Sequence, residues 1–528
     1  MNRRDFMLGG VAAAAWAAAG SRALFGAESP SEREFRTGDV RLMGLYESAL
    51  TTVRGNWLRL PSWPQPVLAE GSVYKGVWME SGPQEGAVLA SLTPEAARSV
   101  ARNNHLIFFG LQKPDGQLPY SVKSAGPGFG QIQMVVPIAA TAWELAQRWG
   151  DEELLTKAYA ACARWDAWLM RYRNTRGTGL CEGFCTYDTG MDNSPRWRGV
   201  PNSCPDGDAR RCPQAAGLPR LCPDLSATVY GGRVALAGMA RVLGRRGEAD
   251  GWAAAAETIR RLIVERLYDA RDGAFYDLDA QNRFVRVRST ATLRVLGEHV
   301  AVAELFETVW RKQVHDPRAF WAPYPFPSVA LDDPEFVRPI PRNSWGGAAQ
   351  ALTALRAPRW MEHYGKPAEL AHVMQRWVEA IGRERAFRQQ MDPLTGAFTQ
   401  DDPGGYSPAA LVLAEFVWRL SGVRENGDLV EWNLRPPAAG ESEFAATMHG
   451  VKAALSYSGG SAELRLGGRR VAQVSGVVRL LTTRAGEMRA AAGIAEGASR
   501  VTLRMPGRPD HSFTIAANER VSLTATIA

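Results

Sequence analysis

Apolar residues recur every three or four positions through the middle of the chain. This spacing predicts amphipathic helices in eight stretches: 132–149, 152–172, 226–245, 249–267, 299–313, 345–356, 366–385 and 407–420. Short loops rich in Gly, Pro and Asp separate them, and strands do not alternate regularly with helices. From about residue 90 to 422 the pattern therefore predicts a mainly α domain of successive helical hairpins, assigned to 90–426.

The pattern changes after Gly427. Apolar and polar residues now alternate, which is typical of half-buried strands, in segments that include 462–467, 474–481, 500–505 and 512–515. A β-sandwich accessory domain over 427–528 fits this alternation. Residues 28–89 contain Gly, Pro and Trp without a clear helical period, and we expect an N-terminal arm or a small β region there.

The N-terminus has the features of an export signal. Arg3 and Arg4 precede Phe6, and an apolar run rich in Ala and Gly follows over residues 8–20. This run is too short to span a membrane, so residues 1–27 are interpreted as a twin-arginine signal. The expected location is periplasmic or secreted. No later run reaches about 18 apolar residues, so no membrane segment is expected after signal removal.

Composition adds limits but no substrate. Of 528 residues, 45% are hydrophobic and 22% are charged, which excludes a disordered chain and a disulfide-stapled miniprotein. The 62 Lys and Arg residues only slightly exceed the 55 Asp and Glu residues, for a net charge of +7, and they are scattered. No nucleic-acid partner is therefore expected. The sequence leaves the oligomeric state open.

The six cysteines divide into two groups. Cys162 lies in an apolar helical pattern and is expected in the core. The remaining five fall between residues 181 and 222, without the CxxC spacing of common zinc sites: Cys181, Cys185, Cys204, Cys212 and Cys222. In an oxidising compartment we expect disulfides among these five, with one thiol left over and the connectivity open.

The same segment carries the strongest candidate chemistry. Residues 189–197 (Thr-Gly-Met-Asp-Asn-Ser-Pro-Arg-Trp) place the Asp192 carboxylate beside Asn193, Arg196 and Trp197. Acids and amides hydrogen-bond sugar hydroxyls, Trp stacks on a sugar face, and a carboxyl can protonate a leaving oxygen. The alternative is a turn that the Asp and Asn side chains stabilise.

Residues 189–197 resemble the SGxDNSPRW-type motif of the clan that includes glycoside hydrolase family 63, mannosylglycerate hydrolases and, more distantly, trehalases. Other segments resemble elements of the same clan in order: 78–81 its WDS element, 112–116 its QxPDG turn, 130–133 its Gln-containing helix start, 224–225 its VDL, and 267–277 its lWdxxdGxyxD segment. The resemblance covers about residues 70–422. It implies an (α/α)6 toroid of six helical hairpins and hydrolysis of a glycoside by an inverting pair of carboxyls.

The resemblance also implies roles for single residues. Asp192 matches the general acid, whereas the position of the clan's basic Glu is Gln389, and a neutral amide cannot accept a proton. Asp392, Asp401, Asp402 or Glu80 could replace the base, with Asp401 or Asp402 and Gln389 lining the water side. The implied sugar pocket consists of Trp78, Glu80, Gln112, Gln133, Asn193, Arg196, Trp197 and Trp345. Residues 343–347 keep a Trp but lack the clan's Arg, which indicates a different sugar or linkage.

Several function classes remain. No GxSxG, P-loop or dinucleotide-binding motif is present, and neither a cofactor nor a metal is predicted. The preferred hypothesis is an exported glycoside hydrolase that cleaves a small glycoside or an oligosaccharide end. Altered chemistry is the first rival, such as a polysaccharide lyase with Tyr187, Tyr230 or Tyr406 as base. A non-catalytic carbohydrate-binding protein is the second.

Overall fold

The computed structural model describes residues 33–399, 404–437, 441–448 and 450–523. The expected export signal and two of the candidate bases, Asp401 and Asp402, lie outside the described residues. None of the described helices is long and apolar enough to cross a membrane.

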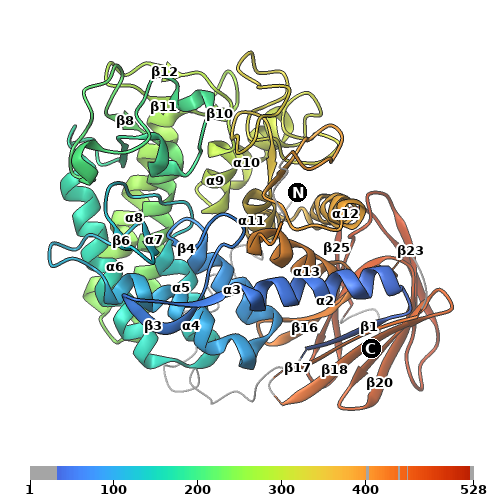
Figure 1. Ribbon diagram of the computed structural model, residues 1–528. Coiled ribbons are helices and arrows are strands. Elements are labelled where there is room, and N and C mark those ends of the chain that lie inside the picture. Colours follow the sequence, from blue (N-terminus) through green and yellow to red (C-terminus); the bar gives the residue numbers. More distant parts are fainter. Residues whose placement is uncertain (1–32, 400–403, 438–440, 449, 524–528) are drawn as a thin grey trace.

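The described chain is rich in helices, which are arranged as consecutive pairs (Figure 1). Five pairs pack together: α3 (Gly82–Leu92) with α4 (Pro94–Gly110), α5 (Ile138–Trp149) with α6 (Glu152–Tyr172), α7 (Pro223–Val242) with α8 (Arg246–Leu267), α11 (Ala351–Met361) with α12 (Pro367–Glu384), and α13 (Ser407–Ser421) with α2 (Val40–Gly55). The remaining pair, α9 (Ala291–Gly297) and α10 (Ala303–Val309), is a pair in chain order.

One helix of each pair contacts its counterparts in a closed cycle. Helix α3 packs on α5, α5 on α7, α7 on α9, α9 on α11, α11 on α13, and α13 again on α3. These helices are buried on several sides, and in α13 almost every residue is buried. Helix α8 instead buries a single stripe, from Ala249 to Leu267, as expected of an outer amphipathic helix. Because each cycle helix is paired with an antiparallel outer helix, the N-terminal ends of the cycle helices lie at one end.

Two antiparallel sheets follow the helices. The larger contains β1 (Arg33–Thr37), β17 (Ser442–Met448), β18 (Val451–Ser458), β19 (Ser461–Leu466), β20 (Arg469–Ser475), β23 (Ser499–Arg504) and β24 (His511–Ile515) in that order. The smaller contains β15 (Val423–Asn426), β16 (Leu429–Leu434), β21 (Val478–Thr483), β22 (Met488–Ala492) and β25 (Arg520–Ser522). These strands lie beside α12 and α13 (Figure 1). The Arg479 guanidinium of β21 joins the two regions by donating to both Glu362 carboxylate oxygens, at 2.6 and 2.8 Å.

The N-terminal region differs from its expected form. Strands do occur there, as β1, β2 (Trp57–Leu60), β3 (Trp63–Leu68) and β4 (Gly76–Trp78), but residues 40–55 form helix α2. The Asp39 side chain caps this helix by accepting from the Arg41 and Leu42 N–H groups. Only Tyr46, Ala49 and Val53 are buried, against α13. A stripe this sparse gives a weak helical period, which explains why the pattern alone missed the helix.

Candidate active site

The loop between α6 and α7 is fixed by a buried carboxylate. Asp188 accepts hydrogen bonds from the Phe184 N–H at 2.7 Å, the Cys185 N–H at 3.2 Å and the Ile132 N–H at 2.9 Å. It also pairs with the guanidinium of Arg173, and both side chains are fully buried. These bonds anchor the segment that leads to Asp192. Removing Arg173 would be costly, because the buried carboxylate of Asp188 would lose its charged partner.

Arg196 fixes the other side of this loop. Its Nη1 and Nη2 donate to the Asp224 carboxylate at 2.8 and 2.7 Å, and its Nε and Nη2 donate to Asp277 at 2.7 and 2.6 Å. All three side chains are buried. The Arg196 guanidinium, which was expected to contact sugar, thus joins the loop to α7 and to β11 (Asp277–Leu278).

Two further residues of the expected sugar pocket also have internal partners. The buried Trp197 donates from Nε1 to Thr189 Oγ1 at 2.8 Å. Gln112 donates to the carbonyl oxygens of Gly116 and Ala161, at 2.8 and 2.9 Å, and so closes its own turn onto α6. In the structure Trp197 and Gln112 thus help to hold the acid loop and the turn at 112–116 in place.

Asp192 and Gln389 are brought together, as the resemblance implied. Asn343 donates from Nδ2 to Asp192 Oδ2 at 3.2 Å and accepts at Oδ1 from Gln389 Nε2 at 3.3 Å. The Tyr74 hydroxyl donates to Gln389 Oε1 at 3.0 Å, and Asn193 donates to the Asn343 carbonyl oxygen at 2.8 Å. A single side chain, that of Asn343, therefore bridges the expected acid and the former base position.

Local pairing of the backbone produces this arrangement. Strand β13 (Ala349–Gln350) pairs with β14 (Gln390–Met391), which places Gln389 at the N-terminal end of α11. The Trp345 N–H donates to the Asp192 carbonyl oxygen at 3.0 Å, so the segment before β13 also contacts the acid loop. Trp345 is 2% exposed.

Glu80 lies against the acid loop. A Cβ placed on Gly190 would be 1.5 Å from Glu80 Oε2, so the carboxylate lies directly on the Gly190 backbone. Glu80 Oε2 is buried without a hydrogen-bond partner among the described residues. Burial, and then the nearby charge of Asp192, raise the pKa of Glu80 to about 7, although Arg356 and Arg294 oppose the shift. Burial also raises the pKa of Asp192, and the bond from Asn343 opposes this.

Two more buried carboxyls were missed by the sequence analysis. Glu70 accepts from the Tyr406 hydroxyl at 2.6 Å, and burial, followed by the charges of Glu80 and Glu85, raises its pKa well above the usual value. Burial also raises the pKa of Glu85 to about 8. Both lie near Glu80, but 70, 80 and 85 share no recognisable motif spacing. An acidic residue in an otherwise apolar segment was the available signal.

The other expected pocket residues take varied positions. Trp78 is partly buried, with its ring edge-on to Tyr74 at 5.7 Å between centroids. Gln133 lies beside Glu80 and lowers its pKa. Asp392 is used in a turn, where it accepts from the Leu394 N–H at 2.8 Å and pairs with Arg338 at 3.3 Å. Asp392 is therefore a structural residue and a poor candidate for the base.

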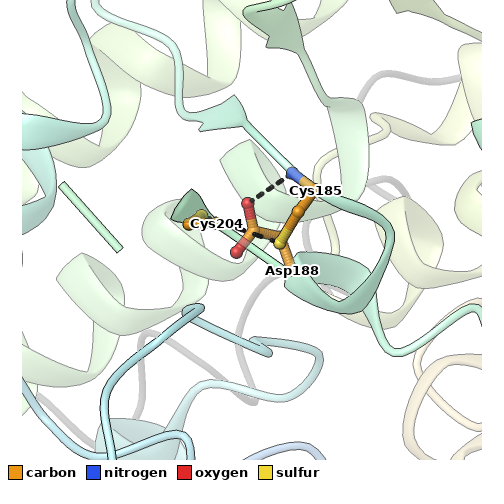
Figure 2. Close-up of side chains that lie close together, drawn as sticks. All are labelled: Cys185, Asp188 and Cys204. Carbon is orange, nitrogen blue, oxygen red and sulfur yellow. Dashed lines mark hydrogen bonds between the residues drawn. The ribbon is translucent and has the colours of Figure 1, made fainter. Parts of the chain in front are cut away.

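The cysteine-rich part of the loop contains no disulfide. All six cysteines are free thiols, and the Cys185 and Cys204 sulfurs are 3.8 Å apart, well beyond the bond length of about 2.05 Å. Figure 2 shows these two residues beside Asp188. These three side chains lie close enough together to hold a metal ion. However, the Asp188 carboxylate already accepts hydrogen bonds from three N–H groups and pairs with Arg173. The disulfides expected among these five cysteines are thus absent, and buried hydrogen bonds to Asp188 hold this loop.

Protonatable buried carboxyls beside amide and indole side chains are typical of sites that act on sugars. The chain belongs to the family described as mannosylglycerate hydrolase MGH1-like glycoside hydrolase domain, whose model matches residues 95–409. It is accordingly a glycosidase. No curated protein matches the chain in sequence.

Solved structures show the same fold at low identity. A mannosylglycerate hydrolase of glycoside hydrolase family 63 from Thermus thermophilus is 19% identical, with a TM-score of 0.58 over 71% of this chain and 100% of its own. A family 78 rhamnosidase of a Bacillus species is 15% identical, with a TM-score of 0.56 over 83% and 42%. The neutral trehalase of Saccharomyces cerevisiae is 14% identical, with a TM-score of 0.51 over 69% and 79%.

The close approach of Gly190 to Glu80 leads to a first prediction. Gly190→Ala should lower kcat/KM by about 100-fold, because the new methyl group must displace Glu80 or the backbone beside Asp192. Gly199→Ala is the matched control: Gly199 has a similar positive φ of 75°, but nothing lies within 4 Å of its added Cβ. Steady-state kinetics check both variants, and equal activities would show that the contact with Glu80 is unimportant.

Proposed function

We propose that this glycosidase hydrolyses a small glycoside, or the end of an oligosaccharide, with inversion of the anomeric carbon. Asp192 is the general acid, and Glu80 accepts the proton of the attacking water. The observation that carries the proposal is the convergence of Asp192, Glu80 and Gln389 at the N-terminal ends of the helix cycle.

Asp192 has the properties that a general acid requires. Its raised pKa lets the carboxyl keep a proton at a higher pH than an ordinary aspartate, and it is only partly buried, so a ligand can reach it. Asn343 also binds its Oδ2, so the carboxyl is oriented before a substrate arrives. Asp188 and Arg196 hold the loop on both sides, which fits the precise placement that proton transfer needs.

Glu80 is a better base than Glu70. A base must be ionised, and with a pKa of about 7 a substantial fraction of Glu80 is ionised near neutral pH. The pKa of Glu70 lies well above its usual value and its Oε1 is already engaged by Tyr406. Gln389 keeps a role without accepting a proton, because its amide can hold water by hydrogen bonds.

The rival functions are less well supported. In a lyase, a tyrosine would remove a proton from carbon, yet burial raises the pKa of Tyr187, Tyr230 and Tyr406, which weakens each as a base near neutral pH. A site that only binds sugar has no need for Glu80, whose unpartnered buried oxygen costs stability. Such costly groups are typical of catalytic sites.

The proposal extends to architecture and location. The closed helix cycle with its outer helices supports an (α/α)6 toroid, and the two sheets support a β-sandwich over 427–528, to which β1 adds a strand.

Residues 1–27 act as a twin-arginine signal, for which Arg3 and Arg4 are the sequence support. Cell fractionation should find the enzyme in the periplasm or outside the cell. Its retention in the cytoplasm would contradict this.

Removal of the acid gives the next prediction. Asp192→Asn should lower kcat/KM by about 100-fold or more for a substrate with a poor leaving group, because the amide cannot protonate the departing oxygen. The loss should be much smaller for an activated aryl glycoside of the same sugar. Asp206→Asn, an exposed acid of the same loop, is the control and should keep full activity. Equal losses on both substrates would contradict the acid role.

The assignment of the base gives a further prediction. Glu80→Gln should lower kcat by about 100-fold or more, and azide or formate should partly restore the rate by replacing the carboxylate. The wild-type pH–rate profile should show a limb near pH 7 from the titration of Glu80, and this limb should be absent in the variant. Glu70→Gln is the matched control and should need no rescue. Rescue of Glu70→Gln instead would transfer the base role to Glu70.

A further inference from the structure

Four side chains of the site form one continuous chain of hydrogen bonds that ends on the proposed acid. The Tyr74 hydroxyl donates to Gln389 Oε1 at 3.0 Å. Gln389 Nε2 in turn donates to Asn343 Oδ1 at 3.3 Å, and Asn343 Nδ2 donates to Asp192 Oδ2 at 3.2 Å. Two neutral amides therefore link a phenol hydroxyl to the carboxyl of Asp192.

This chain has a direction, because each amide has one donor end and one acceptor end. An ionised carboxylate can only accept a hydrogen bond, so Asp192 must face the Nδ2 group of Asn343. The carbonyl oxygen of Asn343 then faces Gln389, which must present its own NH2 group and leave Oε1 to accept from Tyr74. Reversal of either amide alone would bring two donors or two acceptors face to face.

The backbone around Asn343 is held on both sides. Its φ of 45° lies in the left-handed region, which Asn adopts more readily than most residues. Its carbonyl oxygen accepts from Asn193 Nδ2 at 2.8 Å, and the next N–H, that of Ser344, donates to Gln390 Oε1 at 2.8 Å. The Asn343 amide is thus placed between Asp192 and Gln389 by bonds that do not involve a substrate.

The two carboxyl oxygens of Asp192 consequently differ. Oδ2 accepts from Asn343, whereas Oδ1 makes no hydrogen bond to a described residue. A proton on Oδ2 would point at the NH2 group of Asn343, which is also a donor, so the proton of the neutral acid belongs on Oδ1. The side chain of Asp192 is only partly buried, and Oδ1 is the oxygen left for a substrate.

We propose that the two amides, fixed by the Tyr74 hydroxyl, direct the proton of Asp192 to Oδ1, from which it passes to the leaving oxygen. The Oδ1–H bond breaks as the leaving oxygen gains the proton, and the donor of Asn343 stabilises the carboxylate that remains. Asn343 and Gln389 are thus positioning residues. The inference rests on the proposed acid role of Asp192.

The direction of the chain gives a physical reason for an amide at position 389. An ionised glutamate there could only accept hydrogen bonds, so it would accept from Tyr74 and also from the NH2 group of Asn343. Asn343 would then present its carbonyl oxygen to Asp192, and the proton of the acid would lie on Oδ2. A glutamine avoids this reversal.

Gln389→Glu tests the direction of the chain. Near neutral pH, kcat/KM for a substrate with a poor leaving group should fall about 10-fold, because the proton is turned away from the leaving oxygen. An activated aryl glycoside of the same sugar needs little protonation and should be hydrolysed at close to the wild-type rate. A higher kcat on the poor substrate would overturn the proposal, since position 389 would then act as a base.

Asn343→Gly removes the middle of the chain without strain at its positive φ. The bond from Asn343 lowers the pKa of Asp192, so its loss should raise this pKa and move the Asp192 limb of the pH–rate profile to higher pH. The titratable groups around Asp192 are the same in the variant and the wild type: Glu70, Glu80, Tyr74 and Tyr187.

Asn282→Gly is the matched control for the loss of Asn343. Asn282 also has a positive φ, of 60°, but it is exposed and has no bond to the chain of amides. Its replacement should leave both limbs of the profile in place. An unmoved Asp192 limb in Asn343→Gly would overturn the proposal.

Neutron diffraction tests the proposal without a variant and without activity. In crystals of the unaltered protein below the pKa of Asp192, deuterium should lie on Oδ1, and the deuterated Nδ2 of Asn343 should face Oδ2. Deuterium on Oδ2, or amides turned the other way, would overturn the proposal even if Asp192 is the acid. An active Asp192→Asn variant would instead contradict the proposed function and leave the neutron result unchanged.

Discussion

The position of Asp192 depends on the buried ion cluster of Arg196 with Asp224 and Asp277. These bonds join the acid loop to α7 and β11, far from one another in sequence. Removing one member of a buried cluster leaves a charge without a partner, at a cost of about 3–5 kcal/mol. The cluster therefore holds the loop that carries Asp192, and it engages the Arg196 guanidinium with partners inside the protein.

The site concentrates ionisable groups that are costly to bury. The charge of Glu80 raises the pKa values of Glu70 and Glu85, and the charge of Asp192 raises that of Glu80, which Arg356 and Arg294 only partly oppose. A fold selected for stability alone would avoid burying these ionisable groups. A hydrolase benefits from it, because closely spaced carboxyls with different pKa values can divide the tasks of proton donor and acceptor. The neutral Gln389 fits such a site if Glu80 has become the acceptor.

Sequence reasoning located most of the helices, the change to strands and the motif that contains Asp192, since these depend on local periodicity and one compact motif. It missed α2, α3 and α9. It did not reveal the internal partners of Arg196, Trp197 and Gln112, because a motif shows which residues are adjacent but not which way their side chains point. Their partners, such as Asp277 for Arg196, lie up to 81 positions away. Tyr74 and Asn343 were missed as site residues for the same reason: their contacts with Gln389 exist only in the folded chain.

The central claim is that two carboxyls act on opposite faces of a sugar. The most direct measurement is the anomeric configuration of the first sugar released, followed by proton NMR faster than mutarotation. The released sugar should have the anomeric configuration opposite to that of the substrate. Release of the same anomer would contradict it, since retention requires a covalent intermediate on a nucleophilic carboxylate rather than water activated by Glu80.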